Sequence, residues 1–172
     1  MDVFIGDKEE IAVEIRSAHI DGNKSLVGNA RIWLGNNFFG TIYDHIHLNG
    51  YLLGGLFQID TVPVFDNQQS FQRCKSTFDY LYESLSDEEE AKVMDAQSYL
   101  VNFGTLTDMF TIFSYKSGDA ITITWKIRNN DEFNYNRFED LKNYPQTVFS
   151  YTMNFRKFKQ FIEDVERFIL AL

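Results

Sequence analysis

Apolar and polar residues alternate along several separate stretches of this chain, and this alternation is the feature that most constrains its fold. Residues 121–127 show it best, because every second residue is large and apolar and a threonine or lysine stands between. Residues 10–16 and 26–34 repeat the pattern. Successive side chains of a β-strand point to opposite faces of a sheet, so a period of two predicts strands with one buried face.

Turn-forming clusters separate these stretches and predict antiparallel pairing, beginning with a meander in the N-terminal third. The clusters are DGNKS at 21–25, GNN at 35–37 and KSGD at 116–119. The expected strands are residues 3–5, 10–16, 26–34, 38–43, 99–103, 109–115, 121–127 and 148–153.

A helical spacing of apolar residues marks the end of the chain. Residues 155–172 carry one broad apolar face, which predicts a helix packed on the sheet, and Asn154 stands before it as a good N-cap. A second apolar stripe runs along residues 70–85, and residues 45–61 favour a short helix that their glycines weaken. A capping box at residues 86–89 predicts one further short turn.

These elements predict an α+β fold that forms a single domain over residues 1–172. We expect a mainly antiparallel sheet of about six to eight strands packed with two or three helices, including the C-terminal amphipathic helix. A hydrophobic fraction of 44% and 17 phenylalanines exclude disorder for most of the length. No apolar run approaches the ~20 residues that span a bilayer.

The chain is acidic, with a formal net charge of −9 from 25 acidic and 16 basic residues. Phosphate binding needs clustered lysine and arginine, so this balance argues against nucleic acid and against an anionic membrane surface as direct ligands. A basic protein partner is favoured by electrostatic steering. The first ten residues lack the basic region of a secretory signal. Cys74, the only cysteine, is expected to be a buried, inert thiol, and the expected compartment is the cytoplasm.

No motif assigns a catalytic, cofactor-binding or metal-binding residue. His45 and His47 share one face of an expected strand, but they supply only two ligands, with no cysteine or third histidine at a matching spacing. His19 has no serine or cysteine motif around it. GYLLGG at 50–55 lacks the lysine and hydroxyl residue of a phosphate-binding loop and predicts a helix with small packing positions. We expect no metal, no cofactor and no enzymatic activity.

Residues 129–146 set aromatic rings among carboxylates and fit neither a helix nor a strand. One interpretation is that the rings anchor a long loop to the body of the protein. The other is a partner-binding surface, because rigid aromatics within a polar rim are typical of interface hot spots. The candidate contact residues in this segment are Asp131, Glu132, Tyr135, Phe138, Glu139, Asp140 and Tyr144. A second candidate surface is the acidic corner formed by Asp87, Glu88, Glu89 and Glu90.

The first quarter of the chain resembles a known family. IGD at 5–7, IAVEI at 11–15 and LVGNARIWLGNNFFG at 26–40 are similar to the opening of immunity protein 42-type families of bacterial polymorphic toxin systems, which resemble the immunity proteins of contact-dependent growth inhibition. The resemblance implies a small cytoplasmic protein that binds one cognate toxin domain, with a basic nuclease among the candidates. It implies neutralisation by stoichiometric occlusion and carries over no catalytic residue. The alternatives are a small-ligand-binding module or minor enzyme on the same sheet, and an adaptor in a larger complex.

Overall fold

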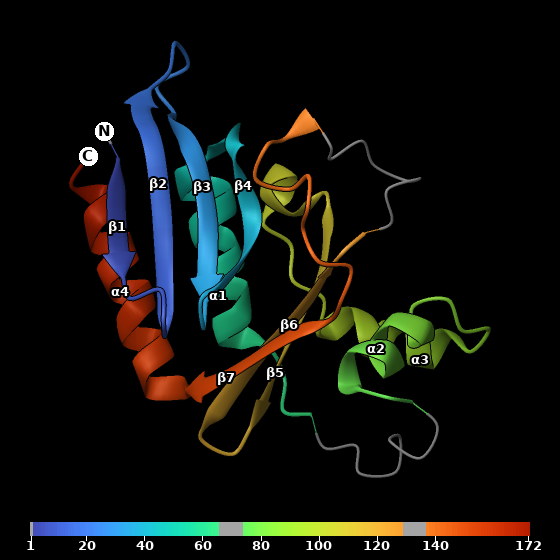
Figure 1. The fold of residues 1–172 in the computed structure, drawn as a ribbon. Coiled ribbons are helices and arrows are strands. Elements are labelled where there is room, and N and C mark those ends of the chain that lie inside the picture. Colours follow the sequence, from blue (N-terminus) through green and yellow to red (C-terminus); the bar gives the residue numbers. More distant parts are fainter. Residues whose placement is uncertain (1, 66–73, 129–136) are drawn as a thin grey trace.

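The alternating stretches form two antiparallel sheets in the computed structural model, which describes residues 2–65, 74–128 and 137–172. The predicted α+β class is confirmed (Figure 1), and the strand orders are β1-β2-β3-β4 and β5-β6-β7. The strands are β1 (Val3–Gly6), β2 (Ile11–Ile20), β3 (Leu26–Leu34), β4 (Asn37–His47), β5 (Phe110–Ser117), β6 (Ala120–Ile127) and β7 (Phe149–Asn154). The α-helices are α1 (Leu53–Thr61), α2 (Thr77–Ser84), α3 (Glu90–Ser98) and α4 (Phe155–Leu170).

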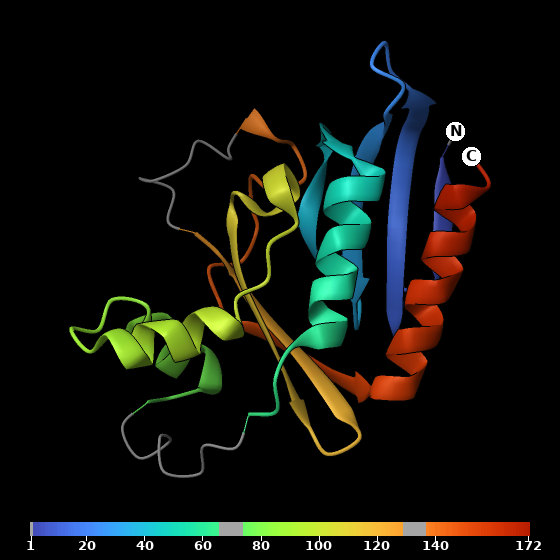
Figure 2. The ribbon, with the colours of Figure 1, turned by 180° about the vertical axis from the view of Figure 1, so that it is seen from behind.

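The four-stranded sheet buries one face under two helices. Ile11 lies opposite Leu34, and Val13 lies opposite Ile32, so the alternation of β2 and β3 brings their apolar residues to the same side. Figure 2 shows α1 and α4 lying across that side. Asn154 caps α4 as predicted, because its side chain accepts hydrogen bonds from two backbone amides of the first turn. The buried residues of α4 are Phe158, Phe161, Ile162, Val165 and Ile169.

The three-stranded sheet shares this core with the first sheet. Trp125 of β6 is fully buried, and its Nε1 donates a hydrogen bond to the carbonyl oxygen of Phe38 on β4 at 3.2 Å. One cluster of buried side chains draws from both sheets and from α1 and α4, so the described residues form a single domain. Within the described residues no helix has the length and apolarity to cross a membrane.

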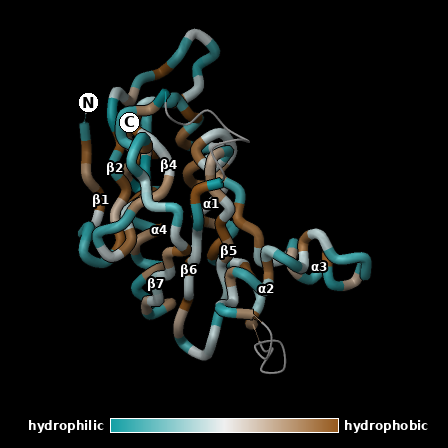
Figure 3. The backbone as a smooth tube through the Cα atoms, turned by 45° about the vertical axis from the view of Figure 1, so that its right-hand side comes forward, coloured by the Kyte–Doolittle hydropathy of each residue, from teal (hydrophilic) through white to brown (hydrophobic). Residues whose placement is uncertain are grey.

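Two helices pack on the other face of the three-stranded sheet through a separate apolar cluster. The ring of Phe78 on α2 meets the ring of Phe113 on β5 at 5.4 Å between centroids. Residues 76–98, which we call the α2–α3 unit, therefore extend to one side of the body (Figure 1). Figure 3 shows much of its outer part coloured as hydrophilic.

Several element boundaries differ from the sequence prediction. The helix expected over residues 70–85 begins at Thr77 in the described chain, because Ser76 accepts a hydrogen bond from the amide of Asp79 and caps it. Cys74 precedes this helix and is partly exposed, so its expected burial is wrong; desolvation and neighbouring Glu83 raise the pKa of its thiol. Residues 70–73 lie outside the described residues.

Three further predictions are corrected in the middle of the chain. Residues 99–103 pair with β5 through only one isolated bridge at Leu100, so they form no strand. Residues 45–61 divide between the end of β4, a π-helical turn (Leu48–Leu52) and α1. The capping box expected at residues 86–89 is wrong, because the full helix α3 begins at Glu90 with Glu89 as its N-cap and without a side-chain cap. The 3₁₀ helix Gly104–Thr107 was also not predicted.

Small packing positions in α1 are confirmed at Gly55. A Cβ atom there would lie 2.1 Å from the ring of Phe103, so only glycine lets the helix approach that ring. The glycine-rich sequence that weakens the helix locally therefore allows it to pack closely in the core.

Candidate functional site

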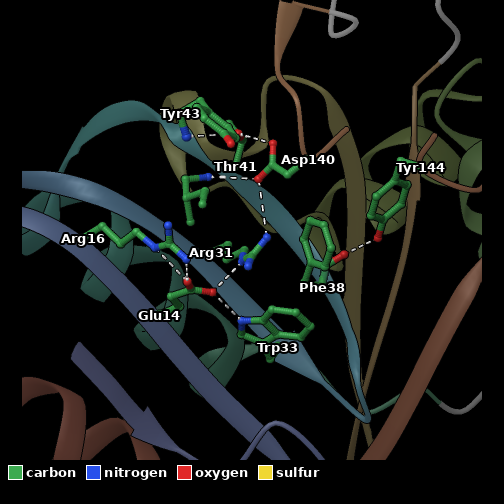
Figure 4. Close-up of polar contacts among 10 residues, drawn as sticks. Glu14, Arg16, Arg31, Trp33, Phe38, Thr41, Tyr43, Asp140 and Tyr144 are labelled. Atoms are coloured by element: carbon green, nitrogen blue, oxygen red, sulfur yellow. Dashed lines mark hydrogen bonds and ion pairs between the residues drawn. The ribbon is translucent and has the colours of Figure 1, made fainter. Parts of the chain in front are cut away.

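A buried carboxylate lies at the centre of the sheet face that α1 and α4 leave uncovered. Glu14 of β2 is only 2% exposed. Its Oε1 accepts a hydrogen bond from Arg16 at 2.7 Å, and its Oε2 accepts one from Arg31 at 2.6 Å and one from the indole nitrogen of Trp33 at 3.1 Å (Figure 4). Burial alone would raise the pKa of Glu14, but the hydrogen bonds from Arg31, Arg16 and Trp33 and the charge of Arg31 bring it below its ordinary value.

Arg31 connects this carboxylate to a distant part of the chain. Its Cζ lies 4.5 Å from the centre of the Trp33 ring and 4.6 Å from the centre of the Phe38 ring. Its Nη1 lies 3.5 Å from Oδ2 of Asp140, which follows β6 by more than ten residues. We call Glu14, Arg16, Arg31, Trp33 and Asp140 the Arg31 network. Because both carboxylates and the two rings contact one guanidinium, this group holds the segment after residue 137 against the first sheet.

Asp140 uses both carboxylate oxygens inside the protein. Oδ1 accepts a hydrogen bond from the hydroxyl of Thr41 at 2.8 Å, and Oδ2 accepts one from the amide of Ile42 at 3.2 Å (Figure 4). With Arg31 as its ion-pair partner, Asp140 is a tether to β3 and β4 in this structure.

The rings of Phe138 and Tyr144 lie inside the protein. Their exposed fractions are 7% and 8%, so the loop-anchoring interpretation describes both side chains. The hydroxyl of Tyr144 donates to the carbonyl of Phe38 and accepts a hydrogen bond from Trp125 at 2.9 Å. Burial raises the pKa of Tyr144 far above its ordinary value, and the hydrogen bond from Trp125 acts in the opposite direction without offsetting it.

Among the described candidates of this segment, Glu139 faces solvent. Its side chain is 68% exposed and pairs with Lys142 at 2.5 Å. Asp131, Glu132 and Tyr135 lie outside the described residues. In the described part of this candidate set, Glu139 is therefore an exposed acid, Asp140 is a tether to β3 and β4, and the rings of Phe138 and Tyr144 are buried anchors.

An open groove runs between the β3–β4 hairpin and the segment after residue 137. Its volume is about 380 Å³. It is lined by Trp33, Asn36, Asn37, Phe38, Glu139, Asp140, Asn143, Tyr144, Pro145 and Phe149. The lining thus combines three asparagines and two acids with four aromatic residues.

The acidic corner is exposed, as predicted. Glu88, Glu89 and Glu90 are exposed, and Asp87 is partly buried. Lys92 pairs with Glu89 at 2.7 Å and with Asp87 at 3.4 Å, and a hydrogen bond from the amide of Glu89 lowers the pKa of Asp87. The α2–α3 unit carries the acids Asp79, Glu83, Asp87, Glu88, Glu89, Glu90 and Asp95 against the single base Lys92. Much of the protein's net negative charge is therefore concentrated here.

The histidines do not gather further ligands in the described structure. His45 and His47 both belong to a strand, β4, as predicted, and the structure shows both to be exposed. The ring of His19 lies 6.1 Å from that of His45. Within the described part of the chain, no three or more histidine, cysteine, aspartate or glutamate side chains are placed to hold a metal ion. The expectation of a metal-free protein stays a prediction.

Comparison with known proteins gives a likeness of fold. No family model matches the sequence, and no curated protein matches it either. The chain is similar to the crystal structure of CdiI from Burkholderia dolosa AUO158, with a TM-score of 0.57, over 96% of this chain and 99% of that chain. This chain and that CdiI therefore share one overall fold. Sequence identity is 14%, so the likeness does not extend to a particular family, and the narrower resemblance to immunity protein 42-type families rests on the quoted N-terminal residues.

Sequence reasoning does not single out the Arg31 network. The signal available in the sequence is a pair of charged or aromatic residues two positions apart on the polar face of each strand, Glu14 with Arg16 and Arg31 with Trp33. Such pairs are ordinary on a solvated face, and only the register of β2 against β3, which sets Glu14 opposite Arg31, turns them into one network.

Proposed function

We propose that this chain is a cytoplasmic immunity protein that binds a bacterial toxin domain and neutralises it by stoichiometric occlusion. The observation that carries the proposal is the likeness to CdiI, because it extends over nearly the whole length of both chains. Binding alone suffices for such a protein, so the proposal needs no catalytic residue.

The charge of the chain supports a basic partner. The net charge is −9. The α2–α3 unit, which lies at one side of the molecule (Figure 1), carries the exposed acids Glu88, Glu89 and Glu90. Attraction between such a surface and a basic toxin domain would speed association. A nuclease is one toxin class that would carry the complementary charge.

Two surfaces are proposed as contacts. One is the acidic corner with Asp87, Glu88, Glu89 and Glu90, and the other is the segment with Asp131, Glu132, Tyr135 and Glu139. Phe138, Asp140 and Tyr144 would support this contact surface by holding the backbone of the segment in place. The two rings are buried, and Asp140 and Tyr144 are hydrogen-bonded to β4.

The decisive experiment is co-expression with the toxin encoded beside this gene. We expect this chain to restore growth of cells that produce the toxin, and the two proteins to co-purify in a 1:1 complex. A toxin variant with an inactivated active site serves as the control for co-purification, because the complex can then be prepared without selecting cells for growth rescue. Failure to restore growth and to form a complex, together with a small molecule retained in native mass spectrometry, would favour the ligand-binding alternative.

A further inference from the structure

We propose that the groove between the β3–β4 hairpin and the segment after residue 137 receives an arginine side chain of the toxin domain. This inference rests on the proposed function and names the group that would anchor the complex.

The groove is preformed by packed aromatic rings. The Tyr144 ring lies 5.2 Å from that of Phe38 and 5.7 Å from that of Phe149, in edge-to-face contacts. Phe149 in turn stacks on buried Trp125 at 5.4 Å. Because these rings are held before any partner arrives, a guest side chain would order little of the protein on binding.

The charge of the groove favours a cationic guest. Among the described residues that line it, two are acidic and none is basic. Asp140 already accepts from Thr41 and Ile42, so Glu139 is the carboxylate left for a guest. Lys142 now pairs with Glu139, but both side chains are about half exposed or more, and exposed pairs contribute little. An incoming cation can therefore displace Lys142.

A guanidinium fits this lining better than other cations. It stacks on aromatic faces and binds a carboxylate through two parallel hydrogen bonds, whereas an ammonium acts as a point charge. Asparagine carbonyls at the rim can accept its remaining N–H groups. Arg31 shows the same chemistry next to the groove, since it contacts two rings and two carboxylates, and those carboxylates balance its charge.

The test is an NMR titration of the full chain with N-acetyl-arginine amide. We expect saturable shifts of the Trp33 indole N–H and of the Asn37 and Asn143 side-chain amides, with a Kd on the order of 1–10 mM for so small a ligand. N-acetyl-citrulline amide has nearly the same shape without the charge and should bind at least about fivefold more weakly.

Matched variants separate the groove from general charge effects. Glu139→Gln should weaken arginine binding at least about threefold, and Lys142→Gln should strengthen it about twofold because Glu139 loses its competitor. Glu163→Gln, on the exposed side of α4, should leave binding unchanged. A gain in Lys142→Gln cannot arise from misfolding.

Equal binding of citrulline, shifts confined to other surfaces, or the same affinity in all three variants would overturn the groove assignment. Growth rescue without an arginine response would overturn it and leave the proposed function standing. A saturable arginine response at these signals without growth rescue would support arginine binding in the groove and contradict the proposed function.

Discussion

Arg31 is held between two carboxylates that belong to distant parts of the chain, so its removal should be costly. In Arg31→Met, Glu14 would stay buried with one partner fewer, and Asp140 would lose its ion pair. We expect the free energy of unfolding to fall by about 3 kcal/mol, as for other broken buried pairs. Urea denaturation measures the loss.

Arg167→Met is the matched control, because Arg167 is 73% exposed and pairs with Asp164 at 3.4 Å. It should cost less than about 1 kcal/mol. Similar losses in the two variants would show that the Arg31 network contributes no more than a surface pair.

The pH dependence of stability should report on Glu14. Its pKa in the folded protein lies below 4.5, the ordinary value, so its contribution is fully present above about pH 4.5 and is lost as the pH falls through the folded pKa. Glu14→Gln should therefore be less stable than the parent at neutral pH, and the gap should narrow as the pH is lowered from about 5 to about 3. Denaturant titrations at several pH values measure this difference in the free energy of unfolding between Glu14→Gln and the parent. Glu163→Gln, which changes an exposed acid, is the control. A gap that is constant with pH would contradict this assignment.

The helix α4 gives a prediction at the scale of an element. Phe161 is buried at 6% exposure, whereas Phe168 is only partly buried. Phe161→Ala should destabilise the protein by ~3–5 kcal/mol, the range for a large core residue, and Phe168→Ala should cost clearly less. If chemical denaturation shows that both variants lose little free energy of unfolding, and about the same amount, this face of α4 is not part of the core.

Elements with a strong local signal were predictable from the sequence, and elements fixed by distant contacts were not. Strands β3 and β6 and the helix α4 follow directly from period and capping, because one face of each is largely buried. The first half of β2 follows in the same way, whereas its second half, after Ile15, is partly buried or exposed on both faces. The predicted start of α2 was wrong, because Ser76 caps the helix and sets its start at Thr77, although the apolar stripe begins earlier in the sequence. The α3 helix carries little apolar periodicity, and its packing against α2 and β5 sustains it.

The candidate site was predictable only in its composition. The sequence shows which acids and rings stand in residues 129–146, but not that Phe138 and Tyr144 turn inward while Glu139 turns outward. The direction of Tyr144 depends on its hydrogen bonds with Trp125 and Phe38, one on each sheet, which lie 19 and 106 residues away in sequence.

At the scale of the whole molecule, the uneven charge predicts how association should respond to salt. If the proposed function holds, reversing Glu88 and Glu90 to lysine should slow association with a basic toxin domain about tenfold at low salt and flatten its salt dependence. Dissociation should change little, because exposed rim charges act mainly on encounter. Stopped-flow or surface-based kinetics at two salt concentrations measure both rates.

Reversal of Glu163 and Glu166, away from the α2–α3 unit on α4, changes the net charge equally and serves as the control. Equal slowing in both double variants would show that net charge alone steers the encounter, with no preferred side.

The two tryptophans occupy very different surroundings, and the protein consequently carries two intrinsic optical probes. Trp125 is 1% exposed and stacked on Phe149 between the sheets, whereas Trp33 is partly exposed at the edge of the groove with Lys8 and Arg31 over its ring. Emission from Trp125 should be blue-shifted and shielded from acrylamide, and emission from Trp33 should be accessible to the quencher. Quenching of the accessible fraction would follow occupancy of the groove, while the shielded fraction would change only when the two sheets come apart.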